Sequence, residues 1–145
     1  MIVLLDAGPL GIVSNPNASA VNKECYGWME SLIISGVQVF VPEIADYEVR
    51  RELLRANKVQ GLARLDLIKS SIGYLPITTL VMLKAAELWA QSRRSGMPTA
   101  DPQALDCDVI LAAQALEVGG IVATENVGHL SRFVDARHWR DIKET

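Results

Sequence analysis

Short runs dominated by apolar and β-branched residues constrain the fold of this chain more than any other feature. Such runs lie at residues 2–5, 37–41 and 121–124, and a weaker one lies at residues 74–77. Runs of this kind are typical of strands that are buried on both faces of a sheet, as in a parallel sheet covered by helices. The sequence therefore predicts four strands of one buried sheet.

Apolar residues that recur every three or four positions between these runs predict amphipathic helices. The clearest pattern covers residues 18–34 and stops before Gly36, a residue suited to the left-handed conformation that closes a helix. Gly8–Pro9 predicts a break after the first strand, residues 14–17 predict a loop, and the segment from residue 127 predicts an irregular tail. The remaining helices are expected at residues 43–56, 60–69, 79–93 and 105–117.

Strands that alternate with helices in this way favour an α/β fold with a mainly parallel sheet between two layers of helices. The length of 145 residues corresponds to a single domain, residues 1–145. A loop is expected at residues 95–102, where Asp101 would cap the helix that Pro102 opens. In such sheets binding sites form beyond the carboxyl ends of the strands, where the strand order reverses. Residues that directly follow a strand are therefore the first candidates for function.

Composition excludes several classes of protein. Half of the residues are apolar and about a fifth are charged, which excludes a disordered chain. The net charge of −3 excludes a strongly basic protein that coats nucleic acid, but not an enzyme that recruits cations to its site. No apolar run is long enough to span a membrane and no basic segment precedes the first one, so a cytoplasmic protein is expected. Two cysteines, Cys25 and Cys107, and two histidines fit a reduced chain without a zinc site.

Three acidic residues stand where the predicted sheet would place a site. Asp6 directly follows the first strand, Glu48 lies on the helix after the second, and Asp108 lies on the helix before the last. Each also has a purely structural interpretation. Asp6 could satisfy backbone amides in a turn, and Asp108 could interact favourably with a helix N-terminus. Glu48 could form an ion pair along its helix with Arg51 or Arg55.

Taken together, the three carboxylates indicate a metal site. Carboxylates within about 4–6 Å of one another repel, and their pKa values rise unless a cation joins them. Oxygen ligands of this kind suit Mg²⁺ or Mn²⁺, which can lower the pKa of a water molecule and polarise a phosphoryl oxygen. Those are the requirements of phosphodiester hydrolysis. Asp106 is also acidic, but it lies two positions from Asp108 and would face elsewhere unless it precedes the helix.

The acidic residues lie within motifs that resemble those of a known family, the PIN-domain ribonucleases, which include the VapC-type toxins of bacterial toxin–antitoxin pairs. The first motif is a strand that ends in Asp6, the second contains Glu48, and the third is a helix that begins with Asp108. The motifs follow one another in order over nearly the whole chain. They occupy residues 4–10, 42–53, 108–116 and 124–130, and residues 137–139 are also similar to the family.

The resemblance implies a Rossmann-like three-layer α/β/α sandwich and metal-dependent cleavage of RNA. It implies that Asp6, Glu48 and Asp108 bind Mg²⁺ or Mn²⁺ and carry the catalysis, with supporting roles for Thr124 and Asn126. It further implies a homodimer and a cognate antitoxin as partner. We expect water to attack the scissile phosphate, which would leave a 5′-phosphate and a 3′-hydroxyl, with Glu48 or Asp108 as the general base.

Two positions depart from the family pattern. Many members have Ser or Thr two residues after the first Asp, where this chain has Gly8, and Asn126 occupies the place of a fourth acid. We hypothesise that Asp106 supplies the missing charge. The departures leave open a second interpretation, a weakly active or inactive domain that binds RNA or protein. A third, an aspartyl-phosphate phosphohydrolase or phosphoacceptor, would need an acid near Asp6 at position 8 and a lysine soon after residue 124, and the sequence has neither.

Binding of RNA also requires cationic side chains, because the phosphate backbone supplies most of the affinity. Each basic residue of this chain could equally form part of a solvated helix face. Trp28, Trp89 and Trp139 could stack on bases, although packing in the core or in a dimer is the expected role. The basic candidates are Arg50, Arg51, Arg55 and Lys58 on or just after one helix, Arg93 and Arg94 on another, and Arg132, Arg137 and Arg140 near the tail.

Overall fold

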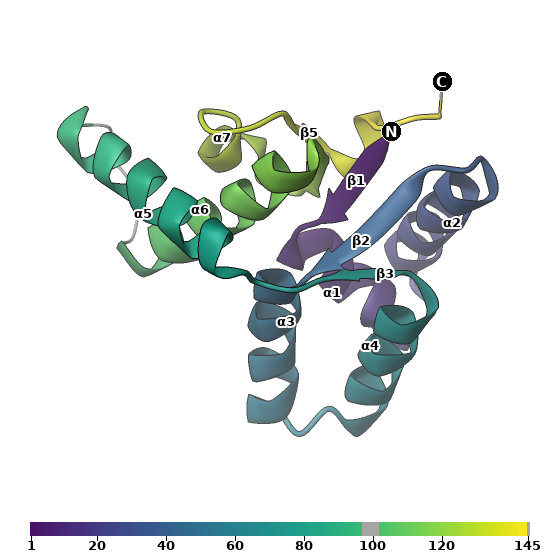
Figure 1. Ribbon diagram of the computed structural model, residues 1–145. Helices are drawn as coiled ribbons and strands as arrows, with labels where there is room; N and C mark the ends of the chain where they lie inside the picture. Colours follow the sequence, from purple (N-terminus) through teal and green to yellow (C-terminus); the bar gives the residue numbers. More distant parts are fainter. Residues whose placement is uncertain (97–101, 145) are drawn as a thin grey trace.

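The core of the molecule is one parallel sheet. The structure is a computed structural model that describes residues 1–96 and 102–144, so most of the loop expected at residues 95–102, with its cap at Asp101, lies outside the described residues. The sheet has five strands in the order β3-β2-β1-β4-β5, and each neighbouring pair is parallel (Figure 1). The strands are β1 (Ile2–Leu5), β2 (Gln38–Pro42), β3 (Gly73–Leu75), β4 (Ile121–Thr124) and β5 (Ala136–His138). The parallel sheet and its four predicted strands are confirmed.

Helices cover both faces of the sheet, which confirms the predicted three-layer α/β/α arrangement (Figure 1). α1, α2 and α4 pack on one face, α6 and α7 pack on the other, and α5 packs against α6 rather than against the sheet. No helix in the described ranges is both long enough and apolar enough to cross a membrane. The helices are α1 (Ala7–Ser14), α2 (Ala20–Ile34), α3 (Glu43–Arg55), α4 (Val59–Ser71), α5 (Thr79–Arg94), α6 (Pro102–Val118) and α7 (Val127–Leu130).

The alternation of side chains along β1 divides the core into two halves. Val3 and Leu5 are fully buried in a cluster with residues of α1, α2 and α4. Leu4 points to the opposite face, where it packs in a cluster that includes Leu111 of α6. A strand buried on both faces needs no polar residue, because neither side meets water. This explains the unbroken apolar run at the start of the chain and places the end of β1 in the middle of the molecule.

The first helix contradicts the break expected at Gly8–Pro9. α1 begins directly at Ala7, with Asp6 as its N-cap, and the Leu10 amide donates to the Asp6 carbonyl oxygen at 3.0 Å. Pro9 is the third residue of this helix. The first backbone N–H groups of a helix have no partner within it, so a proline there removes no hydrogen bond. The residue that was expected to end the local structure is therefore part of its first turn.

The tail after residue 127 is also more regular than expected. It contains α7, the edge strand β5 and a short 3₁₀-helix at Trp139–Asp141. The indole N–H of Trp28 donates to the Ile142 carbonyl oxygen at 2.9 Å, and the Trp139 side chain is buried against the Trp28 ring. Arg140 forms an ion pair with Glu24 of α2 at 2.8 Å. These contacts fix the tail across the first core cluster, beside β4.

Candidate active site

Asp6 lies at the point where the strand order reverses. β1 pairs with β2 on one side and with β4 on the other, so the chain leaves β1 between the ends of its two neighbours. One carboxylate oxygen, Oδ1, accepts a hydrogen bond from the Ala7 amide at 2.7 Å. The other, Oδ2, accepts from the hydroxyl of Thr124, at the end of β4, also at 2.7 Å. Burial raises the pKa of Asp6, and these two hydrogen bonds oppose the rise.

Glu48 lies in the second turn of α3, the helix that follows β2, and its side chain is half-buried. The ion pair with Arg51 or Arg55 that its spacing allowed is absent from the described residues, and Arg55 pairs with Glu52 instead. Burial raises the pKa of Glu48 to about 7, and the charges of Asp6 and Asp108 add to the rise while Arg51 opposes it. Glu48 is therefore a carboxylate whose charge the surrounding protein does not balance.

Asp108 lies on α6, the helix before β4. Its Oδ2 atom is 3.7 Å from Nδ1 of His129, which belongs to α7. Burial raises the pKa of Asp108 to about 6, and the charge of Asp6 adds to the rise while His129 and Arg132 oppose it. The pKa values of Glu48 and Asp108 are thus both raised by the charge of Asp6. The three carboxylates, called here the acidic site, share one electrostatic environment at the carboxyl end of the sheet.

The chemistry of the acidic site fits a hard divalent cation. Its donors are carboxylate oxygens. Burial raises the pKa of all three, and the charge of Asp6 raises those of Glu48 and Asp108 further, which is the effect that a bound cation would reverse. In the described part of the chain, no three acidic, histidine or cysteine side chains lie close enough to form a complete set of protein ligands. Magnesium commonly retains several water ligands and takes only one or two carboxylates, so a complete protein set is not required.

The residues after β4 support Asp6 without adding a charge to it. The Thr124 side chain is fully buried, and its hydroxyl, while donating to Asp6, accepts the Asn126 backbone N–H at 2.9 Å. Asn126 itself is exposed. Glu125 is held away from the acidic site, because its Oε1 accepts from the Trp139 indole N–H at 2.9 Å. The fourth acid of the family pattern therefore has no charged replacement in this segment.

Gly8 is packed against the Glu125 side chain. A Cβ atom at position 8 would lie 2.8 Å from Cγ of Glu125 and 3.2 Å from its Cβ. A serine or threonine there would displace Glu125 from Trp139 and from His138, whose Nε2 is 3.5 Å from the Glu125 carboxylate. The structure thus accounts for the first departure from the family pattern: Glu125 occupies the space that a side chain at position 8 would need.

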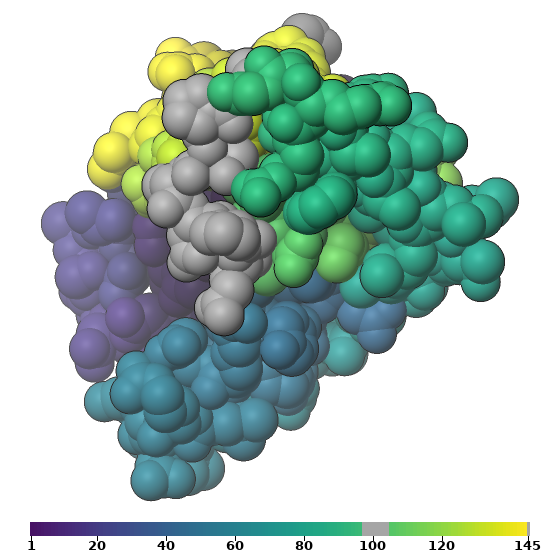
Figure 2. All heavy atoms as spheres, turned by 90° about the vertical axis from the view of Figure 1, so that its left-hand side faces the viewer, coloured from purple at the N-terminus to yellow at the C-terminus, as the bar shows by residue number. Residues whose placement is uncertain are grey.

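Asp106 does not approach the acidic site. α6 begins at Pro102, so Asp106 and Asp108 both lie within the helix, about 200° apart around its axis. Asp106 is exposed and lines a groove between α5 and α6 with Met82 and Trp89. The structure therefore gives no support to the hypothesis that Asp106 supplies a fourth charge. Figure 2 views the molecule from the left-hand side of Figure 1, with the blue atoms of α3 at the bottom and the green atoms of α5 at the right.

Most of the arginines predicted to bind RNA contact other side chains of the protein. Arg50 bridges Asp46 and Asp66, at 2.9 and 2.7 Å, and Arg55 pairs with Glu52 at 2.8 Å. The guanidinium of Arg93 lies over the Trp89 ring, and Arg94 is exposed at the end of α5. Of the other tail candidates, Arg137 and Arg140 both form ion pairs. Arg51 and Arg132 are the two that act on the pKa values of Glu48 and Asp108.

His129 is the residue of the site to which the sequence assigned no role. It appears within the fourth motif, but nothing in its spacing from Asp108, 21 positions earlier, indicates a contact. The contact arises because α7 packs on α6 after the chain has passed through β4. Trp28 of α2 and Trp139 of the tail pack against each other, which is the packing role expected for them, and both cysteines are free.

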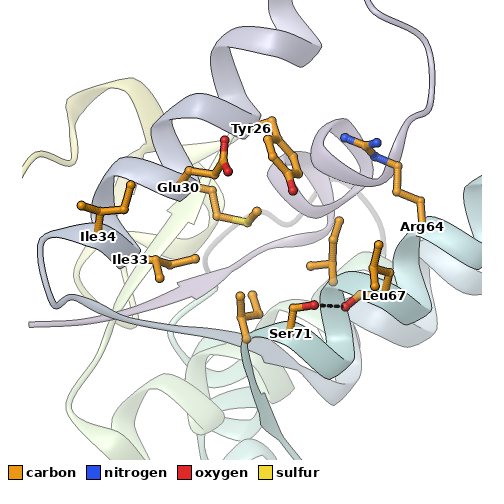
Figure 3. Close-up of a pocket in the computed structure, with 10 residues that line it drawn as sticks. Tyr26, Glu30, Ile33, Ile34, Arg64, Leu67 and Ser71 are labelled. Carbon is orange, nitrogen blue, oxygen red and sulfur yellow. Dashed lines mark hydrogen bonds between the residues drawn. The ribbon is translucent and has the colours of Figure 1, made fainter.

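A separate pocket is formed by elements other than those that carry the three carboxylates. It has a volume of about 280 Å³ and lies between α2 and α4, lined by Tyr26, Glu30, Ile33, Arg64 and Leu67 (Figure 3). Its lining is mainly apolar, with one acid and one arginine at its edge (Figure 3). None of the three carboxylates of the acidic site lines it.

Solved structures with the same fold come from toxin–antitoxin complexes. The chain has a TM-score of 0.77 and 17% identity to a chain of VapBC2 from Rickettsia felis, bound to a DNA fragment from its promoter, with 96% of this chain and 99% of that chain covered. A chain of FitAcB from Neisseria gonorrhoeae has a TM-score of 0.73 and 20% identity, with 97% of this chain and 99% of that chain covered. A chain of VapBC-1 from nontypeable Haemophilus influenzae has a TM-score of 0.73 and 16% identity, with 97% of this chain and 100% of that chain covered. No protein-family model and no curated protein sequence matches the chain. The chain thus has the fold of a VapC-type PIN domain, as its sequence motifs imply.

Proposed function

We propose that this protein is a divalent-metal-dependent endoribonuclease and the toxin of a toxin–antitoxin pair. The observation that carries the proposal is the acidic site: Asp6 directly follows β1 at the strand switch, and burial together with the charge of Asp6 raises the pKa of both Glu48 and Asp108. Uncompensated carboxylates are costly to a fold, and perturbed pKa values of this kind concentrate at functional sites. The shared fold with chains of VapBC and FitAB complexes supports the same class.

In this proposal Asp6, Glu48 and Asp108 would hold Mg²⁺ or Mn²⁺. The cation would act as a Lewis acid toward a phosphoryl oxygen and would lower the pKa of a water molecule. Asp6 is suited to be the fixed ligand, because hydrogen bonds from Ala7 and Thr124 orient both of its oxygens. The proposal needs no fourth carboxylate.

The general base is best assigned to Glu48. Both oxygens of Asp6 already accept hydrogen bonds, and the carboxylate of Asp108 faces His129. Glu48 has no ion-pair partner among the described residues and lies on α3, the helix that follows β2, next to β1 in the sheet. A carboxylate in this position could take the proton of the attacking water, which would leave a 5′-phosphate and a 3′-hydroxyl. A 2′,3′-cyclic phosphate among the products would contradict this assignment.

The partners follow from the same proposal. A cognate antitoxin would hold the nuclease inactive in the cytoplasm, as the assembly of the similar chains with antitoxins suggests. A homodimer would cover the exposed apolar side chains of the α5–α6 pair. These are Leu80, Met82, Leu83, Trp89 and Leu116.

Cleavage of labelled single-stranded RNA tests the proposal. The wild-type protein should cleave with Mn²⁺ or Mg²⁺ and should fail in EDTA. Asp108→Asn should abolish cleavage, whereas Asp106→Asn, a matched change on the same helix, should leave it intact because Asp106 faces the α5–α6 groove. Cleavage that survives Asp108→Asn would exclude the acidic site as the catalytic centre.

A second candidate function is an RNA- or protein-binding domain with a weakened site. Two observations favour it: the described residues form no complete set of protein ligands for a metal, and Gly8 and Asn126 bring neither a hydroxyl nor a charge to the site. This function predicts that Mn²⁺ binds without any cleavage of RNA. Cleavage in the experiment above would exclude it.

A further inference from the structure

We infer that Arg51 and Arg132 bind the phosphate backbone of single-stranded RNA on two opposite sides of the acidic site. The inference rests on the proposed function, because it assigns the substrate contacts of that site. The two arginines come from different parts of the chain. Arg51 lies on α3, which follows β2, and Arg132 follows α7, which comes after β4. β1, with Asp6 at its end, lies between β2 and β4, so the two arginines belong to segments that follow the strands on either side of β1.

Arg51 lies one helical turn after Glu48, on the same exposed side of α3. Its guanidinium stands 5.0 Å from the centre of the Tyr47 ring, which holds the long side chain against the helix surface. It forms no ion pair with a carboxylate in the described part of the chain. Its five N–H donors are thus largely available to a ligand that approaches Glu48 from solvent.

Arg132 is connected to Asp108 through His129. Its Nε donates to the His129 carbonyl oxygen at 3.2 Å, and the Nδ1 atom of the same histidine is 3.7 Å from Asp108. The guanidinium lies 4.7 Å from the Phe133 ring centre. Arg132 forms no ion pair with a carboxylate in residues 1–96 and 102–144. Its terminal nitrogens, which are not used in the bond to His129, remain able to donate to an oxyanion.

Five of the other arginines already bind a protein oxygen, and Arg93 and Arg94, which form no ion pair among the described residues, lie on α5, a helix that carries none of the three carboxylates. Arg50, Arg55, Arg137 and Arg140 each contact a carboxylate at 2.9 Å or less. Arg64 donates to the Val13 carbonyl oxygen, between α1 and α4. A guanidinium that already binds a carboxylate must lose that partner to bind a phosphate. Arg51 and Arg132 would lose none.

A phosphodiester chain is the ligand that suits this arrangement. The protein has a net charge of −3, and the acidic site repels any polyanion that approaches it. Cations beside the carboxylates are therefore required to hold RNA over them. Two guanidinium groups on opposite sides would each bind a phosphate with two parallel hydrogen bonds, one on each side of the bond to be cut. The strand would then cross the acidic site from α3 to α7.

Binding of a labelled, mixed-sequence single-stranded RNA of about 16 nucleotides tests the inference by fluorescence anisotropy. The measurement is made with Mg²⁺ present, and every protein also carries Asp6→Asn to prevent cleavage. We expect Arg51→Gln and Arg132→Gln to weaken binding about tenfold each, and the double variant about 100-fold, because the two sites do not touch. Each variant should reduce the slope of log affinity against log salt by about 0.7, the value for one lost contact with single-stranded phosphate.

Matched control variants are Arg55→Gln on α3 and Arg137→Gln on the tail, both of which remove an exposed, ion-paired arginine. Their affinities and salt slopes should equal those of the parent protein. Thermal unfolding checks that all variants fold, and Arg51, which is exposed, tests the inference even if Arg132→Gln is destabilised. Arg51→Gln with unchanged affinity and slope would overturn the inference, as would a parent protein that binds no RNA.

The outcome is independent of the cleavage test. Binding that depends on Arg51 and Arg132, in a protein that never cleaves RNA with Mg²⁺ or Mn²⁺, would reject the nuclease and keep the phosphate contacts. Cleavage that depends on Asp108, in a protein whose RNA binding is unaffected by the two arginine variants, would keep the nuclease and reject the contacts.

Discussion

Two acidic residues on α3, Asp46 and Glu48, differ in the charged groups that surround their carboxylates. Asp46 has a side chain that is only 9% exposed, and Arg50 contacts it at 2.9 Å while Lys69 lies at 3.8 Å. Glu48 is two positions later, and burial, with the charges of Asp6 and Asp108 adding to it, raises its pKa to about 7. The first carboxylate is compensated by the fold, and the second is not.

This difference separates a structural charge from a functional one. A buried carboxylate with fixed cationic partners holds α3 against α4, because Arg50 also reaches Asp66 of α4. A buried carboxylate without a cationic partner lowers the stability of the fold, because no ion pair offsets the cost of its desolvation. We interpret the Glu48 side of the helix as a surface kept ready for a cation. Substitutions at the acidic residues of this helix should separate the two roles.

Glu48→Gln should reduce the rate of metal-dependent RNA cleavage on the order of 1000-fold, because the amide cannot accept the proton of the attacking water. Asp46→Ala should leave the rate per folded molecule unchanged. Initial rates under single-turnover conditions, normalised to the folded fraction, measure both. Equal losses in the two variants would mean that the comparison does not separate catalysis from stability.

Asp46→Ala should lower the free energy of unfolding by about 2–3 kcal/mol, because it leaves Arg50 and Lys69 partly buried without their shared partner. Urea denaturation at pH 7 measures the change. Asp66→Ala is the matched control, since its side chain is 62% exposed and its loss should cost less than about 1 kcal/mol. A similar cost for both variants would show that burial of Asp46 is not the cause.

Glu48→Gln should stabilise the metal-free protein at pH 8 by about 1–2 kcal/mol, a value reduced for partial exposure to solvent. The folded protein holds the Glu48 proton more tightly than the unfolded chain does. Stability from this residue is therefore full below pH 4.5 and falls as the pH rises to about 7. The variant should match the wild type near pH 4 and exceed it at pH 8 in EDTA. A variant less stable than the wild type at pH 8 would contradict the raised pKa.

Glu52→Gln should change the free energy of unfolding by less than about 0.5 kcal/mol, the smallest effect expected on this helix. Glu52 pairs with Arg55 at 2.8 Å, but both side chains are more than half exposed. The same denaturation experiment measures it. A loss as large as that of Asp46→Ala would show that contact distance, rather than burial, decides the contribution of an ion pair in this protein.

Much of the fold could be predicted from the sequence because its strands have no polar alternation. The buried runs of β1 and β4 and the helix closed by Gly36, with a φ of +89°, follow from local patterns. The first helix and the elements of the tail could not be found in this way. α1 contains Gly8 and Pro9, and its stability comes from the Asp6 cap and from packing rather than from helix propensity. β5 has three residues and gains its place from pairing with β4.

The candidate site was predictable only in part. Asp6, Glu48 and Asp108 could be identified because they stand in motifs at strand ends and on the helices beside them. That Asp106 faces away from Asp108 could be seen only once the first residue of α6 was known. The contact between His129 and Asp108 depends on how α7 packs on α6. The different roles of Arg50 and Arg51 also depend on tertiary structure, because Arg50 forms an ion pair with Asp66 on another helix.

Calorimetric titration of the metal-free protein with Mn²⁺ tests whether the three carboxylates form a cation site. If the acidic site is an uncompensated cation site, Mn²⁺ should bind near pH 6.5 with release of about one proton, because Glu48 and Asp108 are partly protonated there, and with almost none near pH 8.5. Asp6→Asn should weaken this binding strongly, and Asp46→Asn should not. Absence of Mn²⁺ binding, or binding that Asp6→Asn leaves unchanged, would contradict the account.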